Sequence, residues 1–155
     1  MKKQISHMSD TIIRKANTSD LESILALINT PEVDNGKTME LRDANTIYQS
    51  ILHDPNYFQF VASSDQGIIG IVTLVIIMQM THEGATTALI TDLVVVSGEE
   101  KVAITSQLLK YATDLAQEYG CYKTIIYNDY QQDETLSACQ DLGFEQSNPG
   151  FLMPE

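Results

Sequence analysis

The chain has 155 residues, of which 43% are hydrophobic and 19% are charged, a composition typical of a folded globular protein. Its 9 basic and 21 acidic residues give a formal net charge of −12, which disfavours both nucleic acid and anionic membranes as partners. We expect a single domain over residues 11–155, preceded by a flexible N-terminus over residues 1–10.

Cysteine and histidine are few and scattered along the sequence. Cys121, Cys139 and the three histidines show no spacing typical of metal ligands, so no metal site is expected. The N-terminus lacks an apolar signal-like segment, which together with the low cysteine content predicts a reduced, cytoplasmic protein. The longest apolar run, residues 68–80, is interrupted by polar residues and is shorter than the ~20 residues of a membrane helix. It predicts a core strand.

The first third of the chain has the pattern of one strand followed by two helices. Residues 11–15 predict a short strand, and residues 17–20 offer side-chain oxygens that can cap a helix. Apolar residues then recur at helical spacing as far as Ile28. The turn-rich segment 31–37 separates this helix from a second one, expected over residues 39–52.

The middle of the chain changes to a strand pattern. Residues 57–63, 68–80 and 87–96 predict three consecutive strands joined by short turns, which form an antiparallel meander. The third of these carries β-branched residues on both faces near its end. This is typical of a central strand that is covered on both sides.

The last third predicts a parallel crossover. Apolar residues at helical spacing follow the turn at residues 97–101, and Gly120 ends this helix. A strand at residues 122–127, a helix at 133–141 and a closing pair of short strands within 144–153 complete the chain. We therefore expect an α/β (α+β) fold with a mixed central sheet of about six or seven strands and helices on both faces.

The order of these elements, the segment DLVVVSGEEKVAITSQLLKYATDLAQEYG (residues 92–120) and the later LGFE together resemble the GNAT superfamily of N-acetyltransferases. Within it, TDLVVV and GCYK are similar to segments of glucosamine-6-phosphate N-acetyltransferases. The resemblance covers nearly the whole chain. It implies a transferase in which a substrate amine attacks the thioester of acetyl-CoA directly. It also implies a homodimer formed through C-terminal strands, although residues 150–153 could instead complete the sheet of the monomer.

The resemblance also implies which residues bind the cosubstrate. It assigns the pantetheine arm and thioester to backbone groups of Leu93, Val94, Val95 and Val96. It assigns the pyrophosphate to the start of the following helix, with Lys101, Ala103, Ile104, Thr105 and Ser106. The apolar side chains of residues 94–96 are equally typical of an ordinary core strand.

The pyrophosphate turn departs from the family pattern Q/R-x-x-G-x-G/A, which falls here on Glu100, Ala103 and Thr105. Thr105 is expected to crowd the turn, and Glu100 places a negative charge where a donor is usual. Like charges ~6 Å apart at an effective dielectric of about 20 repel by roughly 3 kcal/mol, so weak CoA binding is expected. In the alternative interpretation, Glu99 and Glu100 only complement the positive end of the helix.

Five residues are candidates for proton transfer. Cys139 occupies the position where the family commonly has a tyrosine that protonates the leaving thiolate, and Tyr130 is a possible substitute. A packing role is the alternative for both. Asp92 is the candidate for receiving the amine proton, with His82 and Glu83 in the preceding turn as further candidates.

The same comparison disfavours glucosamine 6-phosphate as the acceptor, because only Asp92 remains of an expected acidic pair and no basic residue follows Lys123. An acidic protein suits a small cationic amine better. The sequence therefore leaves two alternative functions. The first is an acetyl-CoA-dependent N-acetyltransferase that acts on a small amine. The second is a catalytically impaired protein of the same fold that binds a small molecule or a protein.

Overall fold

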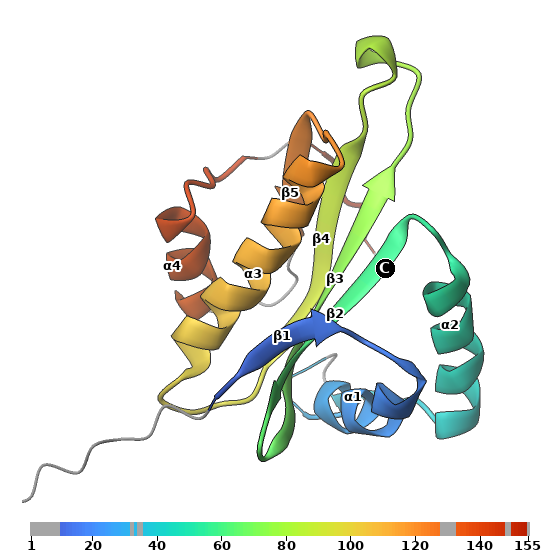
Figure 1. The fold of residues 1–155 in the computed structure, drawn as a ribbon, viewed down its shortest axis with the longest axis vertical. Coiled ribbons are helices and arrows are strands. Elements are labelled where there is room, and N and C mark those ends of the chain that lie inside the picture. The colour runs from blue at the N-terminus through green and yellow to red at the C-terminus, as the bar shows by residue number, and fades with distance from the viewer. Residues whose placement is uncertain (1–9, 32, 34–35, 128–132, 148–149, 155) are drawn as a thin grey trace, which may run out of the picture.

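Five strands form one sheet in the computed structural model, which describes residues 10–31, 33, 36–127, 133–147 and 150–154. The strand order is β1-β2-β3-β4-β5 (Figure 1). The first three neighbouring pairs are antiparallel, and β4 and β5 are parallel. The strands are β1 (Ile12–Lys15), β2 (Tyr57–Ser64), β3 (Gly67–Ile77), β4 (Thr87–Val95) and β5 (Lys123–Ile126).

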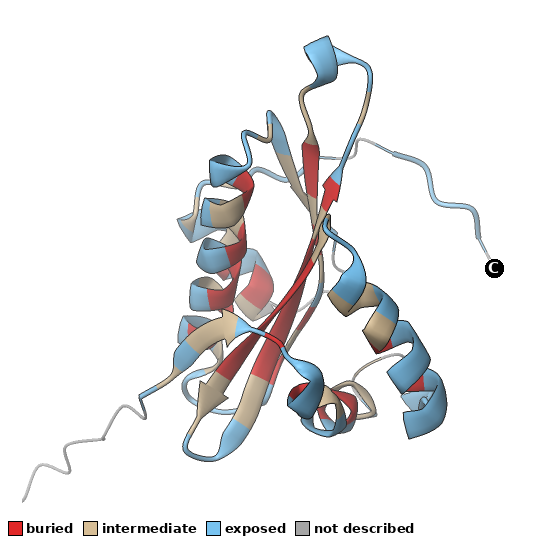
Figure 2. Cartoon of the chain, turned by 45° about the vertical axis from the view of Figure 1, so that its right-hand side comes forward, coloured by how far each residue is buried: buried red, intermediate tan, exposed pale blue. Residues whose placement is uncertain are grey.

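Helices cover both faces of this sheet (Figures 1 and 2). One face, called here the α1–α2 face, carries α1 (Leu21–Ile28) and α2 (Leu41–His53). The opposite α3–α4 face carries α3 (Lys101–Glu118), which connects β4 to β5, and α4 (Asp133–Asp141), which packs against α3. None of the described helices is long and apolar enough to cross a membrane.

Successive side chains of each strand enter the two layers alternately, as β2 illustrates. Phe58 and Phe60 join the apolar cluster on the α3–α4 face, whereas Gln59 and Val61 lie on the α1–α2 face. The cluster under α3 includes Leu74, Ile90, Leu108 and Leu109, all of them fully buried. Figure 2 shows the buried residues concentrated in the central strands and on the inner sides of the helices.

Polar contacts fix the start of α1 against β1 and α2. The Asn17 side chain accepts a bond from the Ser19 N–H, and Asp20 accepts one from the Asn17 N–H, which makes a capping box. Arg14 donates two bonds to the Asp20 carboxylate, at 2.7 and 2.8 Å. The Tyr48 hydroxyl, from α2, donates to the Asn17 carbonyl at 2.7 Å. These bonds join β1, α1 and α2 into one unit.

The expected order of strands and helices is confirmed, as are the antiparallel meander, the parallel pairing of β4 with β5 and the helices on both faces. The number of strands differs: the described residues contain five rather than six or seven. The additional pair was expected within residues 144–153, but residues 144–147 and 150–153 contain no strand. Pro149 and Gly150 in this segment disfavour a strand, because proline lacks the N–H and glycine contributes no packing.

Candidate functional site

Asp92 lies on a β-bulge near the end of β4. Between the pairs Thr73–Thr91 and Ile71–Val94, β3 advances two residues and β4 advances three. The extra residue is accommodated by a left-handed backbone at Asp92, whose φ is +50°. The Asp92 side chain consequently faces the α1–α2 side of the sheet, where it lines a pocket.

Beyond the bulge, β4 and β5 separate. Their last pair is Ile90–Ile126, and the Tyr127 N–H donates to the Ile90 carbonyl at 2.9 Å, yet β4 continues to Val95. The Val96 N–H donates to the Ile69 carbonyl at 2.9 Å, so residue 96 directs its N–H toward the β3 side. Backbone groups alternate along a strand, so those of residues 93 and 95 face the opposite side, where β5 has ended and no described strand pairs with them.

The turn after β4 leads into the N-terminus of α3 and carries two acidic residues. Glu100 is the N-cap residue, but its side chain does not cap the helix. The Lys101 N–H donates to the Gly98 carbonyl at 3.3 Å. The N–H groups of a helix's first turn have no acceptor within the helix and attract anions. The exposed side chains of Glu99 and Glu100 oppose that attraction.

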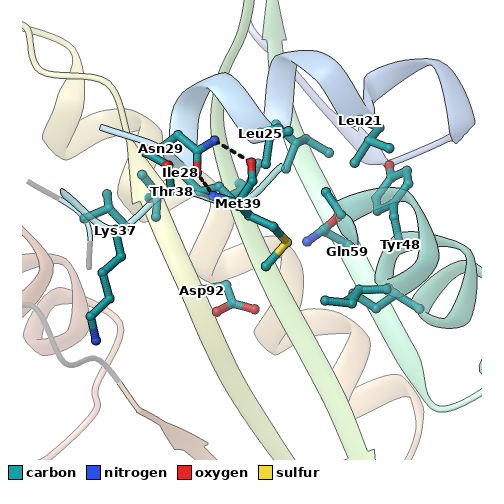
Figure 3. A pocket seen from close by; sticks show the side chains of 17 residues that line it. Leu21, Leu25, Ile28, Asn29, Lys37, Thr38, Met39, Tyr48, Gln59 and Asp92 are labelled. Carbon is teal, nitrogen blue, oxygen red and sulfur yellow. Dashed lines mark hydrogen bonds between the residues drawn. The ribbon is translucent and has the colours of Figure 1, made fainter. Parts of the chain in front are cut away.

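A pocket of about 350 Å³ lies between the sheet, α1 and α2 (Figure 3). Its wall is mainly apolar, with Leu25, Ile28 and Met39 among its residues. The sheet contributes Gln59 from β2 and Asp92 from β4. Asp92 belongs both to this pocket and to the point where β4 separates from β5, so the pocket adjoins the open end of β4.

The connection between α1 and α2 is held over the pocket by one side chain. Asn29 donates from Nδ2 to the Met39 carbonyl at 3.1 Å and accepts from the Met39 N–H at 3.0 Å. Figure 3 shows both bonds and the Met39 side chain extending from this connection into the pocket. Lys37 lies on the same connection at the exposed rim.

The chain matches the sequence model of the acetyltransferase (GNAT) family over residues 21–144. It belongs to the acetyltransferase (GNAT) family. Among solved structures of similar fold, a transcriptional regulator from Bacillus halodurans C-125 has a TM-score of 0.81 at 25% identity, covering 94% of this chain and 99% of that chain. A Trypanosoma brucei acetyltransferase has a TM-score of 0.78 at 21% identity, with 94% and 100% covered.

A glucosamine-6-phosphate N-acetyltransferase from Arabidopsis thaliana also shares the fold, with a TM-score of 0.73 at 17% identity and with 94% of this chain and 97% of that chain covered. At this identity the likeness shows the fold alone, and the expected closeness to this group of GNAT enzymes is not confirmed. No curated protein matches the chain in sequence.

The cofactor-binding residues expected for a GNAT protein fall into two groups. Leu93 to Val96 lie at the separated end of β4, where their role depends on the backbone rather than on the side chains. At the start of α3, the side chains of Ile104 and Thr105 are 4% and 2% exposed and are therefore buried in the interior. The crowding of the turn expected from Thr105 stays a prediction. Lys101, Ala103 and Ser106 remain near the turn as the first residues of α3.

The candidates for proton transfer are not all brought together. Asp92 lines the pocket, whereas Cys139 packs against the apolar cluster on the α3–α4 face. Burial raises the pKa of the Cys139 thiol, which keeps it protonated at neutral pH. His82 and Glu83 lie at the exposed tip of the loop between β3 and β4, which projects beyond the sheet (Figure 1). Tyr130 lies outside the described residues.

Sequence reasoning missed Gln59, which lies in the floor of the pocket. Its side chain is 7% exposed; Nε2 donates to Thr73 Oγ1 at 3.4 Å, but Oε1 has no hydrogen-bond partner among the described residues. Buried amide oxygens without a partner are rare in folded proteins. The signal available in the sequence is a polar residue between Phe58 and Phe60, but that pattern is equally typical of a residue facing solvent.

Proposed function

We propose that the protein is an acetyl-CoA-dependent N-acetyltransferase that acetylates a small amine. The observation that carries the proposal is the placement of Asp92. The bulge directs its carboxylate into the pocket at the point where β4 separates from β5. One side of this junction offers open backbone groups, and the other offers a carboxylate that can bind an ammonium group. The family membership supports acetyl transfer as the reaction.

The residues present fit acetyl-CoA in part. Backbone groups of residues 93 and 95 are open to receive an extended, amide-containing arm, and the first N–H groups of α3 suit a phosphate. Glu99 and Glu100 weaken this second contact. Acetyl-CoA supplies an acetyl group activated as a thioester. The related structure from Clostridium acetobutylicum, 14% identical, is described as containing acetyl-CoA, which supports the same assignment.

The role of Asp92 in this proposal is to bind the amine and to take its proton. The carboxylate pairs with the ammonium form of the substrate and takes one of its protons, which passes to solvent and leaves a neutral amine. The nitrogen of this amine bonds to the acetyl carbon, and the carboxylate accepts a second proton from it. Breaking the bond between the acetyl carbon and sulfur leaves a thiolate, which takes up one proton. Cys139 and Tyr130 are the proposed sources of that proton. The raised pKa of Cys139 makes its thiol available but a weak acid.

A small amine suits the pocket better than a phosphosugar. Lys37 is the basic side chain among the described residues that line it, and Lys37 lies at the exposed rim. Asp92 and the net charge of −12 favour a cation throughout this region.

Asp92→Asn tests the proposal. Asparagine tolerates the left-handed backbone at this position, so the bulge is kept. We expect the variant to bind acetyl-CoA with unchanged affinity, as measured by calorimetry. Its kcat/KM for amines, measured through the release of the CoA thiol, should fall by at least about 100-fold. Asp65→Asn, in the exposed turn between β2 and β3, is the matched control and should match the wild type.

Acetyl-CoA binding distinguishes the enzyme from the alternative of a GNAT-fold binding module. Saturable binding with a dissociation constant in the micromolar range supports the enzyme, whereas no heat at millimolar ligand contradicts it. Glu100→Arg should raise acetyl-CoA affinity about tenfold by removing like-charge repulsion. Thr105 is better left unchanged, because a glycine there would open a cavity under α3.

A homodimer is proposed as the assembly. Phe151, Leu152 and Met153 are 108%, 82% and 86% exposed, and β5, the last strand of the sheet, pairs on its outer edge with no described strand. Exposed apolar residues and an open sheet edge each favour association with a second copy. Light scattering should show a dimer for the wild type and a monomer for Phe151→Ser.

A further inference from the structure

We propose that Gln59 is a specificity-determining residue of the amine site, and that it selects an amine with an apolar body and a second hydrogen-bond donor. This inference rests on the proposed function, because it names the substrate class of the same pocket. The ammonium group binds Asp92, and the second donor, a hydroxyl or an N–H, binds Gln59 Oε1.

Gln59 carries a buried side-chain oxygen that is available to a ligand. The Gln59 side chain is more than nine-tenths buried, its Nε2 is used by Thr73, and its Oε1 has no partner among the described residues. Figure 3 shows the side chain rising from β2 into the pocket. A buried polar atom without a partner destabilises a fold, and a ligand donor placed against it would remove that penalty.

The other polar groups of the pocket are already occupied or exposed. Asn29 is bonded to the backbone of Met39, and the Tyr48 hydroxyl donates to the Asn17 carbonyl. Lys37 lies at the exposed rim. Thr38, which also lines the pocket, is exposed. Asp92 is exposed too, but it carries the one carboxylate of the described lining, and Gln59 carries the buried acceptor without a partner. Both accept hydrogen bonds, so the matching ligand carries a donor at each end.

The sheet sets the separation of these two acceptors. Gln59 is paired with Thr73, Thr73 is paired with Thr91, and Asp92 follows Thr91 on the bulge. Two strand spacings therefore separate Gln59 from the Asp92 position, about 10 Å. The pocket wall is mainly apolar, with Ile28, Met39 and Ile47 among its residues, and Figure 3 shows the Met39 side chain between Asp92 and Gln59. A small apolar body thus fits between the two polar ends, and 350 Å³ is within the usual range for a small-molecule site.

Three matched amines test this proposal: tyramine has a distal hydroxyl donor, phenethylamine has none, and 4-methoxyphenethylamine has an acceptor without a donor. We expect tyramine to exceed both others by about 10- to 100-fold in kcat/KM, because a buried acceptor left unpaired penalises the analogues. Calorimetric titration of each amine without acetyl-CoA should give the same order of affinity.

Gln59→Met removes the amide at nearly constant side-chain length, and should abolish the preference for tyramine by weakening tyramine while leaving phenethylamine within about threefold. Gln79→Met is the matched control. Gln79 is likewise a partly buried amide, but it does not line the pocket. Its Oε1 accepts a bond from Thr87 Oγ1 at 3.3 Å, and its Nε2 has no partner in the part of the chain that the structure describes. This variant should keep the wild-type preference.

The calorimetric arm separates this inference from the proposed function. Tyramine binding that depends on Gln59 supports the inference even when acetyl-CoA does not bind, an outcome that would overturn only the acetyltransferase proposal. Equal binding of tyramine and phenethylamine, or no binding of any of the three amines, overturns the inference. So does a preference for 4-methoxyphenethylamine, because it would mean that Nε2 rather than Oε1 faces the pocket.

Discussion

The two faces of the sheet are joined to their helices in different ways. On the α3–α4 face, fully buried apolar side chains such as Leu74, Ile90 and Leu108 pack together. On the α1–α2 face, a smaller apolar cluster that includes Val61 and Ile71 is combined with an ion pair, hydrogen bonds and a pocket. In this pocket, Gln59 Oε1 has no hydrogen-bond partner among the described residues. The difference shows that the larger apolar cluster lies on the α3–α4 face, whereas the α1–α2 face combines a smaller cluster with an incompletely packed binding site.

Leu108→Ala should have the largest effect on stability. Leu108 is fully buried, so its truncation should lower the free energy of unfolding by about 3–4 kcal/mol, through lost burial and the cavity that remains. Ile47→Ala, on α2 at the pocket, should cost less than about 1 kcal/mol, since Ile47 is 49% exposed. Denaturant unfolding measures both, and equal costs would contradict the contrast between the two faces.

Much of this fold could be predicted from the sequence because hydrophobic period and turn residues agree along most of the chain. The strand ending at Val95, the helix closed by Gly120 and the parallel strand after it are all local patterns. The expected closing strands failed for a different reason. Pairing at the edge of a sheet depends on partners distant in sequence, and a short apolar segment such as residues 151–153 does not reveal whether it has one.

Asp92 was predicted from the resemblance of TDLVVV to the family pattern and not from the bulge on which it lies. Two successive polar residues within an apolar strand, Thr91 and Asp92, are nevertheless a local mark of that irregularity. Gln59 has no such mark. It is buried only because α1 and α2 cover that face of β2, a tertiary effect that alternation along a single strand does not contain.

Asp20→Asn should have the second-largest effect, on the α1–α2 face. Asp20 is 5% exposed and receives bonds from Arg14 and from the Asn17 N–H. Loss of the Asp20 charge should lower the free energy of unfolding by about 2 kcal/mol. This is towards the low end for breaking a buried ion pair, because Arg14 is partly exposed. Asp114→Asn, which breaks an exposed pair with Lys110, is the control and should cost less than about 0.5 kcal/mol.

The same residue gives the α1–α2 face an acid dependence. The hydrogen bonds from Arg14 are the main cause that holds the pKa of Asp20 below its ordinary value of 3.8. A lowered pKa in the folded state means that this stabilisation is complete above the ordinary value and is lost as pH falls through the lower, folded value. Unfolding measured from neutral pH to below 3.8 should show this loss in the wild type. An equal loss in Asp20→Asn would assign it to other carboxylates.

Gly70→Ala should have a smaller effect on stability. It tests the packing of the α3–α4 face by adding a methyl group, whereas Leu108→Ala removes side-chain volume. A Cβ at Gly70 would lie 3.0 Å from Leu108 Cδ1 and 3.3 Å from the Val94 carbonyl oxygen. We expect a cost of about 1.5 kcal/mol from overpacking. Combining Gly70→Ala with Leu108→Ala should cost less than the sum of the two, because the cavity admits the added methyl group. Gly150→Ala, where a Cβ would meet nothing within 4 Å, is the neutral control.

Tyr48→Phe should have the smallest effect on stability. It tests whether the hydrogen bonds that join β1, α1 and α2, called here the polar frame, can be weakened without a change in ligand binding. The variant loses the bond from the hydroxyl to the Asn17 carbonyl, at a cost of about 1 kcal/mol, but keeps the ring that lines the pocket. Burial, and to a lesser degree Asp20, raises the pKa of Tyr48 from 10.0 to about 12.

Because the folded-state pKa of Tyr48 is raised, its stabilisation is complete below the unfolded value of 10.0 and is lost as pH rises towards about 12. The free energy of unfolding of the wild type should therefore fall as pH rises from 10 towards 12. Tyr48→Phe should lack this part of the loss. Tyramine affinity at neutral pH should stay within about twofold of the wild type. A parallel loss of affinity and stability would mean instead that the bonds of the frame also set the shape of the pocket, so that the two roles of this face are coupled.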